Sequence, residues 1–145
     1  MNKFPDRIYI SKDDSSVVVK EIEKTQFLDL HNSKTTRIEL FLFAMALGSE
    51  NPIDLDGKEG FVLESNINEI HKALIYSLFY YYNIKGGENF DQFLNKENVY
   101  EYVQKCAHSG FQQIEYLMKN KNLENVHLEL IDQIDQLWDD YVRNS

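Results

Sequence analysis

The sequence predicts a mainly α protein: residues 1–145 as a single bundle of four or five helices around a buried central helix at about 35–47, with a minor two-stranded β-ribbon. Apolar residues recur every three or four positions in several segments, which is the spacing of a helix face. Cap-forming residues and glycines fall between these segments, where helices begin and end. At 145 residues and 43% hydrophobic content, the chain has the size of one domain with a real core.

The stretch 35–48, TTRIELFLFAMALG, carries the strongest helix signal. Thr36 and Glu39 form a capping-box pattern, strong helix formers follow, and Gly48 stands where helices commonly end in a left-handed residue. The apolar run at 40–47 covers nearly the whole circumference but is far shorter than the roughly 20 residues of a membrane span. We therefore expect a central helix packed on several sides.

The first 25 residues combine a β-prone run with a helical pattern. Residues 7–10, RIYI, predict either a strand or an arm that lies on the body. From Asp13, four cap-forming residues and then mixed apolar and charged positions predict a helix to about Lys24. The three valines at 17–19 leave a strand as the alternative.

Residues 49–64 predict a turn-rich loop followed by an extended piece. Asn51-Pro52 and Asp56-Gly57 are turn sequences, and the residues at 61–63 are Phe, Val and Leu. We expect residues 61–64 to pair with residues 8–10 in the ribbon.

The next predicted helix begins with a second capping pattern, Asn66 and Glu69. Its apolar residues follow at three- and four-residue steps. They are Ile67, Ile70, Leu74, Ile75, Leu78, Phe79 and Tyr82.

Asn95 is expected to cap a long helix that continues to about Met118. Gly110 lies inside this helix, where glycine costs about 1 kcal/mol relative to alanine. Either another backbone crosses close to Gly110 or the helix kinks there.

The last predicted helix runs from about Leu123 to Val142 and is strongly amphipathic. Its opposite face is acidic, with six acidic and two basic residues between 121 and 145. The apolar stripe either completes the core or faces another subunit. It consists of Val126, Leu130, Ile134, Leu137, Trp138 and Tyr141.

The composition argues against several classes of protein. A net charge of −9 does not fit direct nucleic-acid binding, which relies on basic residues that neutralise phosphates. The start, MNKFPDRIYI, lacks the long apolar stretch of a signal peptide, and no later segment is long enough to span a membrane. The single cysteine cannot form an internal disulfide. We therefore expect a cytoplasmic protein with no membrane association.

No segment carries a recognisable catalytic, cofactor or metal motif. The turn at 57–60, GKEG, lacks the first glycine and the hydroxyl residue of a phosphate-binding loop. Cys106 and His108 are two positions apart on a helix, so their side chains point in different directions. Cys106 also falls on the apolar stripe, where cysteine acts as a small hydrophobe. The sequence thus predicts no catalytic, cofactor-binding or metal-binding residues.

The residues that remain as candidates for an interaction surface come from two segments. Tyrosine is favoured at interfaces because one end of its ring is apolar and the other polar, although plain core packing is the alternative. The proposed surface combines the loop at 54–60 with the outer side of the following helix. Its residues are Asp56, Lys58, Glu59, Tyr76, Tyr80 and Tyr81.

Four sequence segments together resemble one family of short prokaryotic proteins. The segments are RIELFLFAMALG, GKEGFVLE, ALIYSLFYYYN and NKENVYEYVQKCAHSGFQQIEYL, within residues 35–118. The last contains an Ala-x-x-Gly-Phe pattern from Ala107 to Phe111. The chain is similar in these segments to small accessory proteins encoded beside DNA phosphorothioation and other phage-defence systems. The resemblance implies a non-enzymatic helper and brings no functional residues.

Three functional hypotheses follow. The first is a non-enzymatic interaction module that binds a protein partner or a second copy of itself. The second is an acidic mimic of DNA, which requires carboxylates from several elements in one continuous band. The third is a small enzyme whose pocket the sequence does not reveal, which requires a concave site with convergent polar groups.

Overall fold

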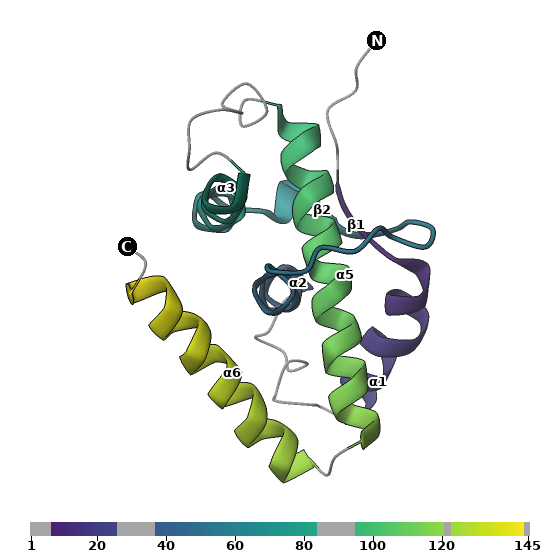
Figure 1. Cartoon of the computed structure of the whole chain (residues 1–145). Helices are drawn as coiled ribbons and strands as arrows, with labels where there is room; N and C mark the ends of the chain where they lie inside the picture. Colours follow the sequence, from purple (N-terminus) through teal and green to yellow (C-terminus); the bar gives the residue numbers. More distant parts are fainter. Residues whose placement is uncertain (1–6, 26–36, 84–94, 121–122, 144–145) are drawn as a thin grey trace.

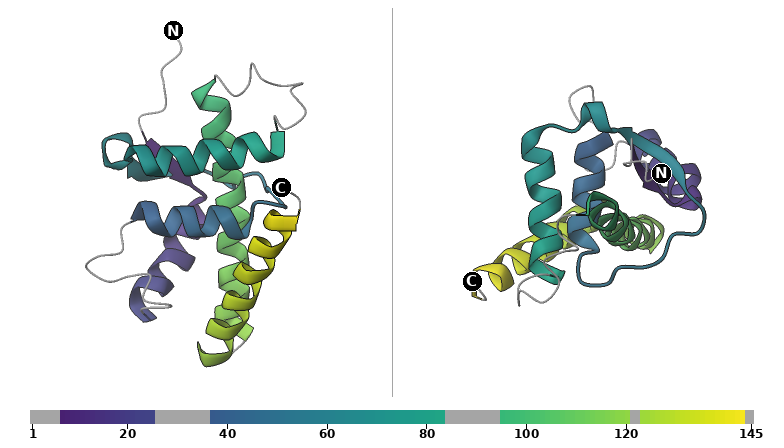
Figure 2. Two further views of the ribbon diagram at one scale, coloured as in Figure 1. Left: turned by 90° about the vertical axis from the view of Figure 1, so that its left-hand side faces the viewer. Right: turned by 90° about the horizontal axis from the view of Figure 1, so that it is seen from above.

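The computed structural model describes residues 7–25, 37–83, 95–120 and 123–143, and it has the predicted mainly α fold with a two-stranded ribbon (Figure 1). Its elements are β1 (Arg7–Ile10), a π-helical segment η1 (Asp14–Val19), α1 (Lys20–Thr25), α2 (Arg37–Leu47), β2 (Glu59–Leu63), a 3₁₀ turn η3 (Glu64–Asn66), α3 (Glu69–Asn83), α5 (Lys96–Asn120) and α6 (Leu123–Arg143). Helices α2, α3 and α6 lie on one side of α5, and the ribbon, η1 and α1 lie on the other (Figures 1 and 2).

Helix α5 stands between these two layers. It contacts α2, α3 and α6 on one side and η1 and β1 on the other. Between Val103 and Phe111 it is buried almost all round, with Lys105 only half-buried. Its start is the predicted one, because the Asn98 N–H donates to Asn95 Oδ1 at 3.2 Å.

Helix α2 is packed on several sides, as its sequence predicted. It contacts α3, α5 and β2. Residues 35 and 36 of the predicted helix lie outside the described residues, and so does the Thr36 cap. Its buried residues are Ile38, Leu40, Phe41, Ala44, Met45 and Leu47.

The backbones of α2 and α5 cross at very short range. A Cβ atom built on Gly110 would lie 1.8 Å from the Ala44 carbonyl oxygen. One built on Gly48 would lie 2.0 Å from the Cys106 carbonyl oxygen. Because α5 is continuous from Lys96 to Asn120, a close crossing explains Gly110, and a break in the helix does not.

The predicted left-handed end of α2 at Gly48 is wrong. Among the described glycines, only Gly57 has a positive φ, at 75°. The Gly48 N–H instead donates to the Ala44 carbonyl at 3.0 Å, which continues the helical pattern. Glycine is needed at position 48 because the backbone of α5 leaves no space for a side chain.

The ribbon forms where it was expected, so residues 7–10 are a strand and not merely an arm. β1 and β2 pair antiparallel, with Ile8 opposite Val62, and the register shifts between Ile8 and Tyr9. The Tyr9 N–H at this irregularity donates to Gln104 Oε1 of α5 at 2.7 Å. At the register shift the Tyr9 N–H does not pair with β2, so the hydrogen bond to Gln104 satisfies it. The same bond fixes the ribbon on α5.

The segment from Asp14 to Thr25 is helical, as predicted, so the strand alternative for its valines is excluded. Its first part is π-helical, which the sequence did not reveal. Val18, Val19 and Ile22 are buried, and η1 packs on α5.

Helix α3 begins with a different cap from the predicted one. The His71 N–H donates to Asn68 Oδ1 at 2.9 Å, and the Asn68 N–H donates to His71 Nδ1 at 3.2 Å. This reciprocal pair has the form of a capping box with histidine in the third helical position. The predicted cap residue, Asn66, lies in the preceding 3₁₀ turn.

The apolar stripe of α3 is buried only in part. Ile75 and Phe79 are buried, whereas Ile70 and Leu74 are 71% and 51% exposed. The helix therefore rests on the core through its second half.

In the described parts of the chain, no helix is both long and apolar enough to cross a membrane.

Candidate functional site

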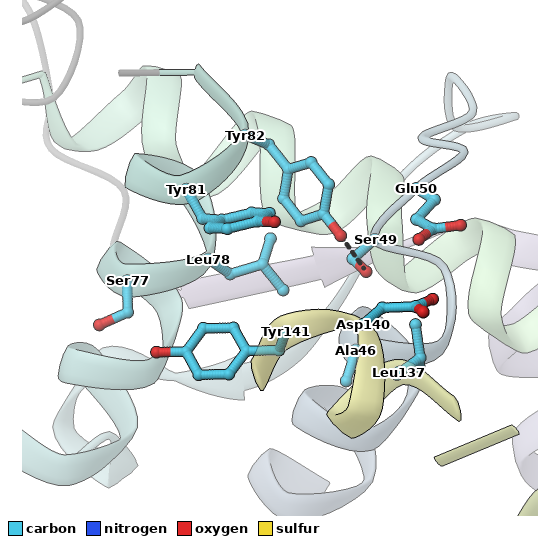
Figure 3. A pocket seen from close by; sticks show the side chains of 10 residues that line it. All are labelled: Ala46, Ser49, Glu50, Ser77, Leu78, Tyr81, Tyr82, Leu137, Asp140 and Tyr141. Carbon is cyan, nitrogen blue, oxygen red and sulfur yellow. Dashed lines mark hydrogen bonds between the residues drawn. The ribbon is translucent and has the colours of Figure 1, made fainter. Parts of the chain in front are cut away.

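A hollow of about 370 Å³ lies where α3, α6 and the end of α2 meet (Figure 3). Its volume falls within the range of ordinary ligand pockets. We call it the tyrosine hollow. Its lining residues are Ala46, Ser49, Glu50, Ser77, Leu78, Tyr81, Tyr82, Leu137, Asp140 and Tyr141.

Aromatic rings connect α3 to α6 across this hollow. The ring centroids of Tyr82 and Tyr81 are 4.9 Å apart in an edge-to-face arrangement. Those of Tyr81 and Tyr141 are 6.2 Å apart, and those of Tyr141 and Trp138 are 5.9 Å apart. These separations are typical of attractive aromatic pairs. The rings of Tyr81, Tyr82 and Tyr141 form a wall that is apolar on its face and carries hydroxyl groups at its edges (Figure 3).

Two kinds of polar group stand at the hollow. The Tyr82 hydroxyl is 3.2 Å from Ser49 Oγ, which ties α3 to the turn after α2. Burial raises the pKa of Tyr82, and the hydrogen bond with Ser49 opposes this shift only in part, so the phenol stays neutral. Glu50, from the turn after α2, and Asp140, from α6, add two carboxylates, and none of the described lining residues is a lysine, arginine or histidine.

A second, smaller hollow of about 220 Å³ lies alongside, between α6 and the junction of α2 with α5. It shares Glu50, Leu137 and Asp140 with the tyrosine hollow and is otherwise lined mainly by amide side chains and Leu47. Helix α6 thus rests over two hollows and is not packed closely against the body.

The orientation of α6 leaves most of its large apolar side chains between residues 131 and 143 exposed, whereas Val126 and Leu130 of the predicted stripe lie outside the residues whose side chains are described. From residue 131 to residue 143, only Gln133, Leu137 and Asp140 are half-buried, so the helix faces the body with a mixed polar edge. We define the α6 stripe by its large exposed apolar side chains. They are Ile131 (53% exposed), Ile134 (43%), Trp138 (63%), Tyr141 (55%) and Val142 (50%).

The residues predicted for an interaction surface are not brought together. Asp56, Lys58 and Glu59 are exposed around the hairpin that leads into β2, on the side of α5 opposite α3 (Figures 1 and 2). Tyr76 is half-buried against the core, and Tyr80 is exposed on α3.

Of the predicted tyrosines, Tyr81 alone lines the hollow. The other wall is formed by Leu137 and Tyr141 of α6, which the sequence marked only as an apolar stripe. Their positions four residues apart indicated one face, but nothing in the sequence indicated which element that face meets.

A buried ion pair lies in the opposite layer. Asp14 Oδ2 and His108 Nδ1 are 2.7 Å apart, and both side chains are at least 96% buried. The Gln112 amide nitrogen is 3.3 Å from His108 Nε2.

Burial raises the pKa of Asp14 to about 6, although its hydrogen bond with His108 and the attraction between the two groups lower it. The pair is enclosed and reaches neither hollow, so it fastens η1 to α5 and has no access to a substrate. No local pattern indicated this contact, since its partners are 94 positions apart.

Cys106 belongs to the core, as predicted. It is fully buried, and burial raises the pKa of its thiol to about 12, so the reactive thiolate is not formed at neutral pH. In the part of the lining that the structure describes, the two hollows contain neither a histidine nor a cysteine. The arrangement suits the binding of an apolar side chain beside a cation.

Comparisons with protein-family models, with curated proteins and with solved structures found no match to this chain.

Proposed function

We propose that this protein is a non-enzymatic interaction module that binds another protein chain through the α6 stripe and the adjoining tyrosine hollow. One observation carries the proposal: between residues 131 and 143, five large apolar side chains of α6 are about half-exposed, while Gln133, Leu137 and Asp140 are the half-buried ones. Single exposed apolar residues are ordinary, but a contiguous stripe that includes tryptophan is typical of a protein-binding surface.

The energetics support a binding role. Full burial of a large apolar side chain contributes about 1.5–3 kcal/mol, so covering five that are about half-exposed contributes roughly 4–7 kcal/mol before the costs of association. A helix whose most apolar side is exposed leaves that contribution unused in the isolated chain. A second chain on this side would supply it.

The sequence resemblance suggests the setting. If the chain is an accessory protein of a prokaryotic DNA-modification or phage-defence system, its partner belongs to the same system. A scaffold that supplies an apolar stripe and no catalytic group fits such a helper role.

The two alternative functions receive less support. DNA mimicry requires an uninterrupted band of carboxylates, yet lysines pair with carboxylates at Lys105–Asp54, Lys96–Glu64 and Lys119–Glu115. Catalysis requires convergent acid, base or nucleophile, whereas most of the described lining of the hollow consists of apolar and tyrosine side chains.

The proposal is tested by isolating tagged protein from its own host and determining its assembly state by native mass spectrometry. The α6 variant Ile134→Ser is compared with Val17→Ser, because Val17 is 48% exposed on η1 in the opposite layer. We expect wild type and Val17→Ser to retain a stoichiometric partner or a self-assembly, and Ile134→Ser to lose it.

Circular dichroism establishes that both variants are folded. A folded wild-type protein that is monomeric and free of any stoichiometric partner contradicts the proposal. So does a partner that Ile134→Ser retains in full.

A further inference from the structure

We infer that the occupant of the α6 stripe and the tyrosine hollow is a cationic amphipathic helix of a different protein, with an apolar side chain inserted into the hollow. This inference rests on the proposed function and adds the chemical class of the partner. It depends on the charges that border the apolar surface.

Those charges are almost all negative. Glu50 and Asp140 line both hollows, and none of the described residues that line them is cationic. On α6, Asp135 and Asp139 are exposed beside the stripe. Between residues 123 and 143 the sequence has six carboxylates and a single arginine. A partner that covers this surface must bring positive charge to the border, because like charges across an interface cost affinity.

The same charges argue against a second copy of this chain. Pairing two α6 stripes would place the acidic borders of both helices side by side, with only Arg143 on each helix to offset them. The whole chain carries a net charge of −9, which adds repulsion at longer range. A basic partner turns both effects into attraction.

The hollow supplies the place for an anchor. Its volume of about 370 Å³ is ample for a leucine or phenylalanine side chain, and Leu78, Tyr81 and Tyr141 surround it with apolar surface. Glu50 and Asp140 stand at its edge, within reach of a lysine one helical turn from the anchor. The α6 stripe then covers the neighbouring turns of the bound helix, which is the groove mode of helix recognition.

The test uses a synthetic helix of about 18 residues, made of leucine and lysine in an amphipathic pattern and free of tryptophan. Its control has glutamate in place of every lysine. Trp138 is the chain's single tryptophan and is 63% exposed in the α6 stripe, so its fluorescence reports directly on occupation. We expect the leucine–lysine peptide to shift Trp138 emission to the blue in a saturable way, and the leucine–glutamate peptide to leave it unchanged.

Two matched double variants distinguish attraction of the peptide to the carboxylates of the hollow from its attraction to the negative net charge of the whole protein. Glu50→Gln with Asp140→Asn removes the two carboxylates of the hollow, and Asp56→Asn with Glu59→Gln removes two exposed carboxylates at the hairpin across α5. We expect the first double variant to weaken peptide binding about tenfold and the second to change it less than about twofold. Both variants remove two negative charges, so a difference between them reports the position of the charges and not the net charge.

Two results overturn the partner class while leaving the proposed function intact. One is equal binding of both peptides. The other is absence of peptide binding together with self-association that Ile134→Ser abolishes, which identifies a second copy as the occupant. Equal weakening by the two double variants also overturns the inference, because it reduces the binding to general attraction. If neither peptide binds and the chain neither self-associates nor retains a partner, the proposed function fails as well.

Discussion

Gly110 of α5 faces the Ala44 carbonyl oxygen of α2 so closely that a methyl group at this position would lie 1.8 Å from it. Real Cβ atoms do not approach backbone so closely, so Gly110→Ala must push the two helices apart. We expect it to lower the free energy of unfolding by about 3 kcal/mol, more than the roughly 1 kcal/mol gained from helix propensity. Chemical denaturation measures the change.

The matched control for this prediction is Gly60→Ala. A Cβ at Gly60 would meet Arg7 Cδ at 2.8 Å, and that atom belongs to a flexible side chain that can move away. We expect a loss below about 1 kcal/mol there. Equal stability of Gly110→Ala and wild type would show that the helices do not cross as described.

The buried pair of Asp14 and His108 predicts a pH dependence of stability. The carboxyl pKa is about 6 in the folded protein and 3.8 for the ordinary group, because burial disfavours its charged form. At pH values between 3.8 and about 6, Asp14 therefore keeps its proton in the folded state and has released it in the unfolded state. The contribution of Asp14 is therefore present in full below about pH 4 and is lost as the pH rises through 6.

The variant Asp14→Asn removes this titration while keeping a hydrogen-bonding side chain next to His108. We expect the stability of wild type relative to Asp14→Asn to fall between pH 4 and pH 7, by up to about 1.4 kcal/mol per pH unit. Denaturation curves at several pH values measure it, and the exposed neighbour variant Asp13→Asn is the control. A difference that stays constant across this range contradicts the assignment.

Glu64 receives bonds from two residues of α5. The Tyr100 hydroxyl donates to Glu64 Oε2 at 2.7 Å, and Lys96 bonds to the other oxygen. Partial burial acts to raise the Glu64 pKa, but the hydrogen bonds from Lys96 and Tyr100 outweigh it, so the pKa is lowered. The resulting stabilisation is present above the ordinary pKa of 4.5 and is lost as the pH falls through the folded value.

We therefore expect Tyr100→Phe to lower the free energy of unfolding by about 1.5–3 kcal/mol at pH 7, as for a hydrogen bond to a charged group. The loss should shrink at low pH, where Glu64 is protonated. A double-mutant cycle with Glu64→Gln at pH 7 isolates the pair. A coupling energy near zero would show that the hydroxyl and the carboxylate do not interact in solution.

The cap of α3 provides a local test. Asn68 and His71 exchange two hydrogen bonds at the start of the helix. Replacing Asn68 by alanine should cost about 1 kcal/mol of stability, whereas Asn66→Ala should cost much less because Asn66 precedes the helix in the 3₁₀ turn. Thermal unfolding followed by circular dichroism distinguishes the two. The reverse order would restore the cap predicted from sequence.

Local patterns were sufficient for much of the fold. Cap residues and three- to four-residue apolar spacing located the helices, since these signals depend only on neighbours in the chain. The interior position of Gly110 even predicted a close crossing as one of two alternatives. Gly48 was misjudged because a glycine after a helix has two uses, and only the position of α5 distinguishes them.

The candidate site was predicted far less well than the fold. Tyr81 was selected from the sequence, but its partners Tyr141 and Leu137 come from α6, more than 50 positions away. The loop at 54–60 was predicted to form one surface with the tyrosines. In the fold, α5 lies between the loop and α3.

The sequence by itself determined the mainly α class, the ribbon, and an amphipathic last helix with one acidic face. Only the tertiary structure decided that between residues 131 and 143 this helix leaves most of its large apolar side chains exposed, and that Asp14 meets His108 in the interior. The physical reason is that periodicity defines which residues share a face, whereas the rotation of that face depends on packing between elements far apart in the chain.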